Sequence, residues 1–175
     1  EWKIYADKKN GFSFRYPPNL ILQKKGGKVR LYHFTKYRYQ DPCDMRSENP
    51  PFLDKLIDFD VTFEIVKKDF ASLVEEFQDM EEAPFKIAKL MGKVEGKSVK
   101  RTFEFCGSYE YFYPFKKNKS LVIEDKIPGY LYELAYSEAK KTKAWKNPNV
   151  IKPEESALIL SKILESFNIP QKEKL

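Results

Sequence analysis

The chain is poor in the residues on which most active sites depend. Its 175 residues include one histidine, His33, and two cysteines, Cys43 and Cys106, which lie far apart and form no Cys-x-x-Cys pair. This scarcity excludes a histidine-rich metal site, a Glu-x-x-His motif and a cysteine-based zinc or redox motif. No serine stands in a Gly-x-Ser-x-Gly sequence and no glycine pattern forms a phosphate-binding loop, so neither a hydrolase nor a nucleotide site is indicated. We predict no enzyme activity, no catalytic residue, no metal and no cofactor.

Arginine is also scarce, and long apolar runs are absent. Among 32 basic residues, arginine occurs only at positions 15, 30, 38, 46 and 101, although the net charge is +6. Because arginine is the better ligand for phosphates and base edges, the lysine-rich balance favours a solvated surface over a nucleic-acid surface. No apolar run is long enough to span a membrane. The chain begins at Glu1 without a methionine, which predicts an excised domain or a mature protein whose leader was removed.

Aromatic side chains, in contrast, are abundant. They make up 15% of the residues, beside 42% apolar and 33% charged residues. This composition is typical of a globular domain, and flat rings favour β-sheet. At this length we predict one domain over residues 1–170, followed by a tail at 171–175.

The first seventeen residues carry the strongest local signal. An Asn10-Gly11 pair stands between alternating aromatic residues and is followed by Pro17, which predicts a β-hairpin over residues 2–16. Alternating apolar residues predict further strands at 28–34, 57–66, 85–91, 94–106, 109–115, 121–123 and 130–136.

Two helices are expected, and they complete the predicted architecture. The first begins with a capping box at Ser72 and Glu75, and the second begins at Pro153 and carries an apolar stripe to Phe167. The polar stretch at 35–51 is predicted to be a long loop, either functional or mobile. These elements indicate an α+β fold, with an antiparallel β-sheet of about six or more strands flanked by helices.

The remaining polar candidates have ordinary structural explanations. His33 shares a predicted strand face with Val29 and Leu31, which favours a buried, hydrogen-bonded or edge histidine over a catalytic one. Asp58 and Asp60 share a strand face near Glu64, where they can hold a cation or pair with lysines across the sheet. The acidic run at 75–82 lacks the spacing of a calcium loop and is expected to be a solvated helix face.

The best candidate for binding is the aromatic strand at 109–115. Tyr109, Tyr111 and Tyr113 share one face, with lysines close behind them, so the row can hold a sugar, a peptide or single-stranded nucleic acid, or form the rim of a core under a helix. The 35–51 loop and a lysine-rich loop at 140–149 are two further candidate contact surfaces. The candidate contacts in the second loop are Lys140, Lys141, Lys143 and Trp145.

Three short motifs, in this order, resemble a known family. They are the opening Trp2…Tyr5…Gly11-Phe12-Ser13-Phe14-Arg15-Tyr16-Pro17, the middle Cys106-Gly107-Ser108-Tyr109 with Tyr111-Phe112-Tyr113-Pro114, and the close Ile163-Leu164-Glu165-Ser166-Phe167-Asn168-Ile169. They are similar to segments of the PsbP-like domains found in bacterial lipoproteins and secreted proteins. The resemblance implies an α/β/α sandwich, the fold shared by an extrinsic photosystem subunit and a nuclear Ran-release factor. It carries over no catalytic constellation, and it implies a place outside the cytoplasmic membrane.

The cysteines allow either two free thiols or one disulfide, which would close a loop of about 63 residues and contribute on the order of 4 kcal/mol. The resemblance favours the Cys43–Cys106 disulfide, because extracytoplasmic proteins retain disulfides. We therefore expect a non-catalytic extracytoplasmic accessory or interaction domain, secreted or membrane-anchored through a removed N-terminal segment. Its expected partner is another envelope or cell-surface protein. The alternative is a basic module that binds single-stranded nucleic acid or another polyanion through the aromatic strand face.

Overall fold

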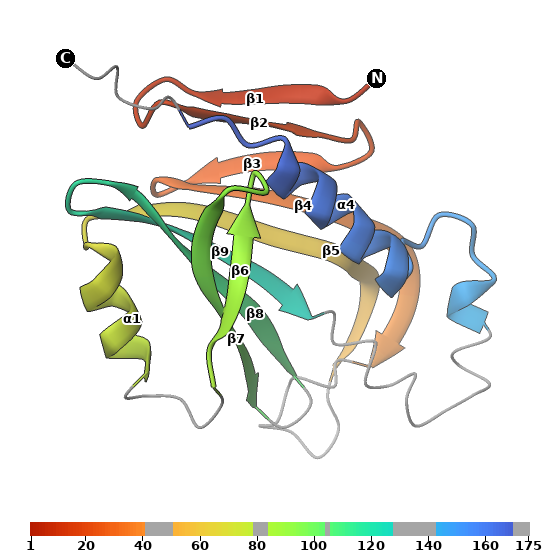
Figure 1. The fold of residues 1–175 in the computed structure, drawn as a ribbon. Helices are drawn as coiled ribbons and strands as arrows, with labels where there is room; N and C mark the ends of the chain where they lie inside the picture. Colours follow the sequence, from red (N-terminus) through yellow and green to blue (C-terminus); the bar gives the residue numbers. More distant parts are fainter. Residues whose placement is uncertain (41–50, 79–83, 104–105, 128–142, 170–175) are drawn as a thin grey trace.

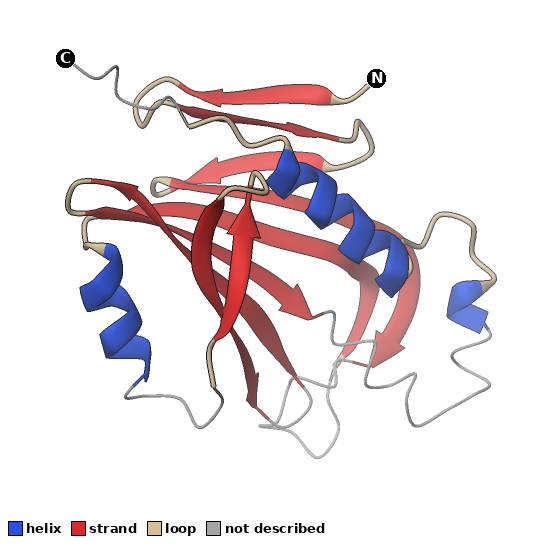
Figure 2. Ribbon diagram, viewed as in Figure 1, coloured by secondary structure: helices blue, strands red, loops and turns tan. Residues whose placement is uncertain are grey.

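The computed structural model describes residues 1–40, 51–78, 84–103, 106–127 and 143–169. In chain order the elements are β1 (Lys3–Asp7), β2 (Phe12–Tyr16), β3 (Ile21–Lys25), β4 (Lys28–Gln40), β5 (Phe52–Val66), α1 (Phe70–Gln78), β6 (Lys86–Leu90), β7 (Val94–Phe103), β8 (Cys106–Lys116), β9 (Lys119–Ile127) and α4 (Pro153–Glu165). Figure 2 also shows a short helical segment before α4, at residues 143–145.

Within these ranges the main sheet has seven strands in the order β3-β4-β5-β9-β8-β7-β6 (Figure 1), and every neighbouring pair is antiparallel. Strands β3 to β5 form one meander and strands β6 to β9 form another. The pairing of β5 with β9 joins the two meanders, with Phe63 opposite Ile123 at its centre. This sheet and its helices confirm the predicted α+β fold class.

The predicted N-terminal hairpin is confirmed, and it lies beside the segment that follows α4 (Figure 1). Strands β1 and β2 pair from Lys3–Tyr16 to Asp7–Phe12. Gly11 takes a positive φ of 71° in the turn, a conformation that glycine adopts without steric cost. Ser13 in β2 then exchanges two backbone hydrogen bonds with Asn168, at 3.0 and 2.8 Å. The segment after α4 is thereby fixed to the hairpin.

One face of the sheet is covered by α4 and by the hairpin. Four rings from three places in the chain meet there: Phe12 stacks on Phe167 at 5.8 Å between centroids, and Phe14 stacks on Phe63 at 4.8 Å. Ile159, Leu160 and Ile163 of α4 join the same core. Because burying one such side chain contributes about 1.5–3 kcal/mol, this cluster holds α4 firmly on the sheet.

The other face carries α1. Leu73 of the helix packs on Val99 and Phe112, and Phe77 lies 4.8 Å from the Phe112 ring. The helix does not begin with the predicted capping box. Asp69 is the cap instead, because its carboxylate accepts hydrogen bonds from the Ser72 backbone N–H at 3.0 Å and from the Ser72 hydroxyl at 2.8 Å. With a helix on each face, the sheet is the middle layer of a sandwich.

Gly96 lies inside β7. A Cβ at this position would come within 2.2 Å of the Phe112 carbonyl oxygen and 2.4 Å of the Tyr113 ring. The absence of a side chain therefore allows Tyr113 to lie flat over the strand.

Other boundaries also differ from the sequence prediction. The 35–51 stretch is not all loop, because β4 continues to Gln40, and strand β3 follows Pro17 and Pro18 where no strand was expected. Strands β8 and β9 are longer than the predicted 109–115 and 121–123. The predicted strand at 130–136, the rest of the 35–51 loop and the predicted tail lie outside the described residues.

Candidate functional site

A bulge in β5 sets the position of its first buried carboxylate. His33 of β4 is opposite Phe59 and Phe34 is opposite Ile57, so Asp58 is an extra residue without a partner in the ladder. The sequence pattern placed Ile57 with Phe59 and Asp58 with Asp60. The bulge breaks both alternations, which is why neither placement holds. It leaves Val29, Leu31 and His33 on one face, as predicted.

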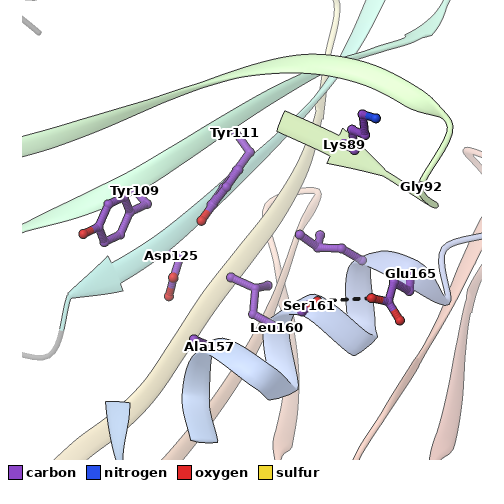
Figure 3. Close-up of a pocket in the computed structure, with 10 residues that line it drawn as sticks. Lys89, Gly92, Tyr109, Tyr111, Asp125, Ala157, Leu160, Ser161 and Glu165 are labelled. Atoms are coloured by element: carbon purple, nitrogen blue, oxygen red, sulfur yellow. Dashed lines mark hydrogen bonds between the residues drawn. The ribbon is translucent and has the colours of Figure 1, made fainter. Parts of the chain in front are cut away.

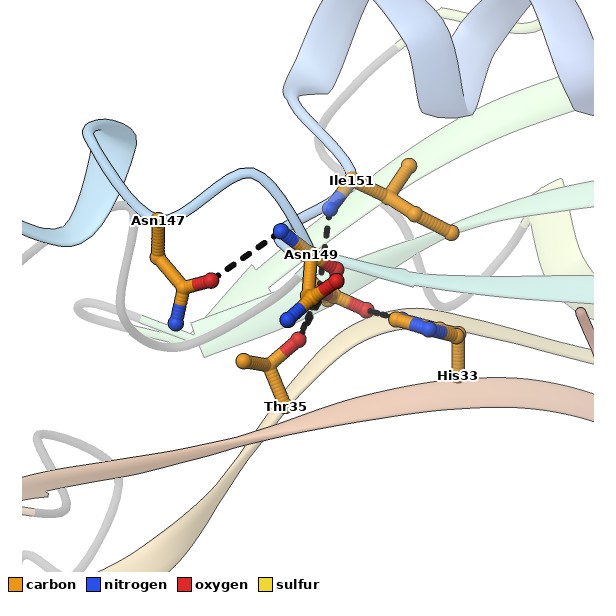
Figure 4. A network of polar contacts seen from close by, with 6 residues as sticks. His33, Thr35, Asn147, Asn149 and Ile151 are labelled. Carbon is orange, nitrogen blue, oxygen red and sulfur yellow. Dashed lines mark hydrogen bonds and ion pairs between the residues drawn. The ribbon is translucent and has the colours of Figure 1, made fainter.

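The Asp58 carboxylate is fully buried and is held by three elements (Figure 4). Its Oδ1 lies 2.6 Å from Nδ1 of His33, and its Oδ2 accepts the backbone N–H of Ile151 at 3.0 Å. The hydroxyl of Thr35 lies 3.3 Å from Oδ2 and donates to the Asn149 carbonyl at 2.9 Å. The network ties β4 and β5 to the segment that leads into α4. His33, the only histidine of the chain, thus has a structural role as a hydrogen-bonded residue, as its sequence pattern indicates.

Two further acidic residues of β5, Asp60 and Glu64, pair with basic residues on β4. Arg30 donates from Nε and Nη2 to Asp60 at 2.6 and 2.8 Å, and these hydrogen bonds raise the pKa of the guanidinium. Lys28 lies 2.8 Å from Glu64 in a solvent-exposed pair. Of the two roles weighed for the Asp58–Glu64 group, cross-strand pairing is the one observed. No three potential metal ligands converge among the described residues.

A pocket of about 510 Å³ opens between α4 and the second meander (Figure 3). Tyr109 and Tyr111 of β8, Asp125 of β9 and Lys89 of β6 form the sheet side. The helix side consists of Ala157, Leu160, Ser161, Leu164 and Glu165. These five helix positions are spaced three or four residues apart, so one face of α4 forms the helix side of the pocket.

Asp125 is the most unusual group in the pocket. It lies on the face of Val61 and Ile123, since Val61 is its ladder partner in β5. Among the described residues, none donates a hydrogen bond or forms an ion pair to its carboxylate. Burial, together with the negative charge of Asp60, raises the pKa of Asp125 to about 7. A carboxyl group in this state can accept hydrogen bonds, donate one when protonated, or balance a cation.

The three tyrosines of the predicted row have different surroundings under α4: two line the pocket, and one lies in the core. Tyr109 is 39% exposed at the pocket rim, and Tyr111 lines the interior, where burial raises its pKa to about 12. Tyr113 is completely buried in the main core, and its hydroxyl has no hydrogen-bond partner in the described part of the chain. The first two tyrosines therefore face a pocket, and the third is a core residue.

The second predicted contact surface is described only in part. Lys143 is exposed, whereas Trp145 packs on a small core of Tyr39, Leu56 and Val150. Lys140 and Lys141 lie outside the described residues. Cys106 is disulfide-bonded, and Cys43, the other cysteine of the chain, also lies outside the described residues, so the pairing stays a prediction.

Asp125 was missed at the level of sequence, although a signal for it exists. Leu121 and Ile123 alternate toward the core, and continuing the same alternation places the side chain of Asp125 on the apolar face. An acid at a core-facing strand position is unusual, because burying a charge requires a partner. The predicted strand ended at Ile123, so it did not include Asp125, whereas β9 continues to Ile127.

Among the described helices, none is long and apolar enough to cross a membrane. No protein-family model matches the chain, and no curated protein matches it. The search of solved structures does return matches. A crystal structure of a protein from Bacteroides thetaiotaomicron aligns over 99% of this chain with a TM-score of 0.54 and 11% identity. This chain spans half of that protein's length.

The family that the sequence resembles is also among the structural matches. The solution structure of the cyanobacterial PsbP protein CyanoP from Synechocystis aligns over 97% of this chain and 92% of its own, with 9% identity and a TM-score of 0.47. At these identities the likeness concerns the fold, and no activity or partner is taken from it. Both matches are likenesses of fold alone, and the second is to a member of the family that the sequence resembles.

Proposed function

We propose that this chain is a non-catalytic accessory domain that binds a partner outside the cytoplasm, through the pocket between α4 and the second meander. The partner is an envelope or cell-surface protein. Matches to solved structures support the fold of such a domain. The proposed binding role follows from the contacts of the acidic residues Asp58 and Asp125.

The observation that carries the proposal is the contrast between Asp58, which is fully buried, and Asp125, which is partly buried at a pocket. Asp58 engages the only histidine and a backbone N–H, so these groups hold the structure together. Asp125 and the two tyrosines beside it face an accessible pocket. A pocket with an apolar wall and a few converging polar groups, here one carboxyl group and two phenols, is typical of a ligand-binding site.

The disulfide at Cys106 supports the extracytoplasmic part of the proposal. Disulfides persist in oxidising compartments and are rare in the cytosol. We expect Cys43 to be its partner. Intact mass after alkylation without reductant, on protein from its native host, should show no labelled thiol, and two labels would contradict this location.

A photocrosslinking experiment tests the binding role. We would replace Tyr109, at the pocket rim, with photoreactive benzoylphenylalanine in the native host. A matched variant carries the same group at Tyr32, which the strand register places on the opposite face of the sheet. We expect an envelope protein to be crosslinked from position 109 and not from position 32. The same products from both positions, or none from position 109, would contradict the proposal.

A further inference from the structure

We propose that the pocket between α4 and the second meander binds the ammonium group of an organic amine, with Asp125 as its counter-ion. This inference deepens the proposed function and rests on it, because it names the chemistry that the same pocket recognises. Three observations point to this ligand class: the missing partner of Asp125, the charges around it, and the lining of the pocket.

The first observation is the unbalanced carboxylate. Elsewhere on the sheet, buried carboxylates have partners. Asp58 contacts His33 and accepts a backbone N–H, and Asp60 accepts hydrogen bonds from Nε and Nη2 of Arg30. Asp125 has none among the described residues, yet it lies at the sheet wall of an accessible pocket (Figure 3). Burial of a carboxylate costs free energy that a bound partner can offset.

The second observation is the sign of the surrounding charges. Although the chain as a whole carries +6, Glu165 adds a second carboxylate at the α4 wall, where it accepts a hydrogen bond from Ser161 at 3.2 Å. Lys89 lines the same pocket, but Figure 3 shows its ammonium pointing away from Asp125. The charged and titratable groups around Asp125 are therefore Asp60 on β5, Tyr109 and Tyr111 on β8, Lys89 on β6, Lys100 on β7 and Glu165 on α4.

The third observation is the lining, which suits the carbon chain of an amine. Leu160, Leu164 and Ala157 provide an apolar wall, and Tyr109 and Tyr111 present rings. Aromatic faces attract cations, and Tyr109 already has the Lys100 ammonium 5.7 Å from its ring centre. The lining thus offers one end for a charged head and an apolar surface for the atoms behind it.

A neutral ligand such as a sugar would satisfy less of this site. A hydroxyl group can donate to Asp125, but it brings no charge that balances the carboxylate. An ammonium donates hydrogen bonds and also balances the negative charge of Asp125. The same chemistry is available from a free amine and from a lysine side chain on a partner protein, so the test includes both.

The test is an NMR titration of the isotope-labelled chain at pH 8 with small probes. Pentane-1,5-diamine represents a free amine, and Nα-acetyl-lysine methylamide represents a protein lysine. Pentane-1,5-diol is the uncharged control for the diamine. We expect saturable shifts in the amides of β8, β9 and α4 with one or both amines, and at least tenfold weaker binding of the diol. Preference for the diamine would indicate a small-molecule source, and preference for the lysine derivative a protein source.

Two variants and two matched controls make the result decisive. Asp125→Asn should weaken amine binding at least tenfold, while Glu124→Gln, on the other face of the same strand, should leave it unchanged. Ser161→Trp should fill the pocket from the helix side, while Lys162→Trp on the adjacent exposed position should not. Equal binding of amine and diol, no saturable shift, or undiminished binding by Asp125→Asn would overturn the proposal. Crosslinking from position 109 that persists in Asp125→Asn would preserve the binding role and reject the amine.

Discussion

Two carboxylates lie on the same face of the sheet and have opposite surroundings. Asp58 is completely buried and receives hydrogen bonds from a neighbouring strand and from the segment before α4. Asp125, on the strand next to β5, lies at the edge of a pocket without a donor in the described residues. Burial alone therefore does not separate structural from functional groups; the presence of a partner does.

The difference follows from the course of the chain. The bulge at Asp58 directs its carboxylate toward the residues that approach α4, where it accepts the backbone N–H of Ile151 in the core. In the described part of the chain no comparable segment donates to Asp125, and the α4 residues that line its pocket include Ala157, Leu160 and Ser161. Asp58, whose carboxylate has hydrogen-bond partners, therefore fixes the segment before α4, whereas Asp125, without a donor among the described residues, lines the pocket beneath the helix.

Removing the partnered carboxylate should have the largest effect. Asp58→Ala removes the buried carboxylate that accepts the Ile151 N–H and contacts the His33 ring, so we expect a loss of about 3–5 kcal/mol in the free energy of unfolding. Urea denaturation measures it. Asp54→Ala is the control, because the Asp54 side chain is 81% exposed and its removal should change little. A loss below about 1 kcal/mol for Asp58→Ala would show that the network does not hold the fold.

Removing the unpartnered carboxylate should have the opposite sign. The pKa of Asp125 is raised from 3.8 to about 7 in the folded protein, so the folded state retains a proton that the unfolded state releases. Its favourable contribution is complete below pH 4 and is lost as the pH rises through 7. Asp125→Asn cannot ionise, so it should be more stable than the wild type at pH 8 by on the order of 4 kcal/mol.

The pH profile distinguishes this effect from ordinary repacking. The stability difference between Asp125→Asn and the wild type should be small at pH 4, should grow to about pH 7 and should then level off. Thermal or urea unfolding at five or six pH values measures it. A difference that is independent of pH would mean that Asp125 has a partner in solution.

A third carboxylate sharpens the comparison, because Asp69 has partners but no burial. Its hydrogen bonds with the Ser72 backbone N–H and hydroxyl lower its pKa, so its contribution is present above the ordinary aspartate pKa and is lost as the pH falls. Asp69→Ala should reduce the urea midpoint less than Asp58→Ala does. Asp69→Asn should restore most of the loss, because asparagine caps helices well. Failure of Asn to rescue would assign the effect to charge instead.

Much of the fold was predictable because its signals are local. The Asn10-Gly11 turn, the alternation from Val29 to His33 and the apolar stripe of α4 each depend on residues close in sequence, and each prediction is confirmed. The bulge was not predictable, since no glycine or proline marks it and its cause is a hydrogen bond to Ile151, far along the chain.

The candidate site was predictable only in part. The tyrosine alternation identified Tyr109 and Tyr111, but the helix that turns their strand face into a pocket comes from residues 157–165. The same alternation included Tyr113, whose burial depends on the missing side chain of Gly96 in the neighbouring strand. Distances between strands, and the space left at one residue, are not encoded in a single local pattern.

The join between β5 and β9 has a consequence for how the chain folds. All other pairings of the main sheet connect strands adjacent in sequence, so each meander can form through short loops. The β5–β9 pairing brings Phe63 to Ile123, and it requires a much larger loss of chain entropy. We therefore expect two separately forming units whose docking limits the folding rate. Truncating Ile123 should slow refolding, whereas truncating Leu22, at the far edge in β3, should mainly accelerate unfolding.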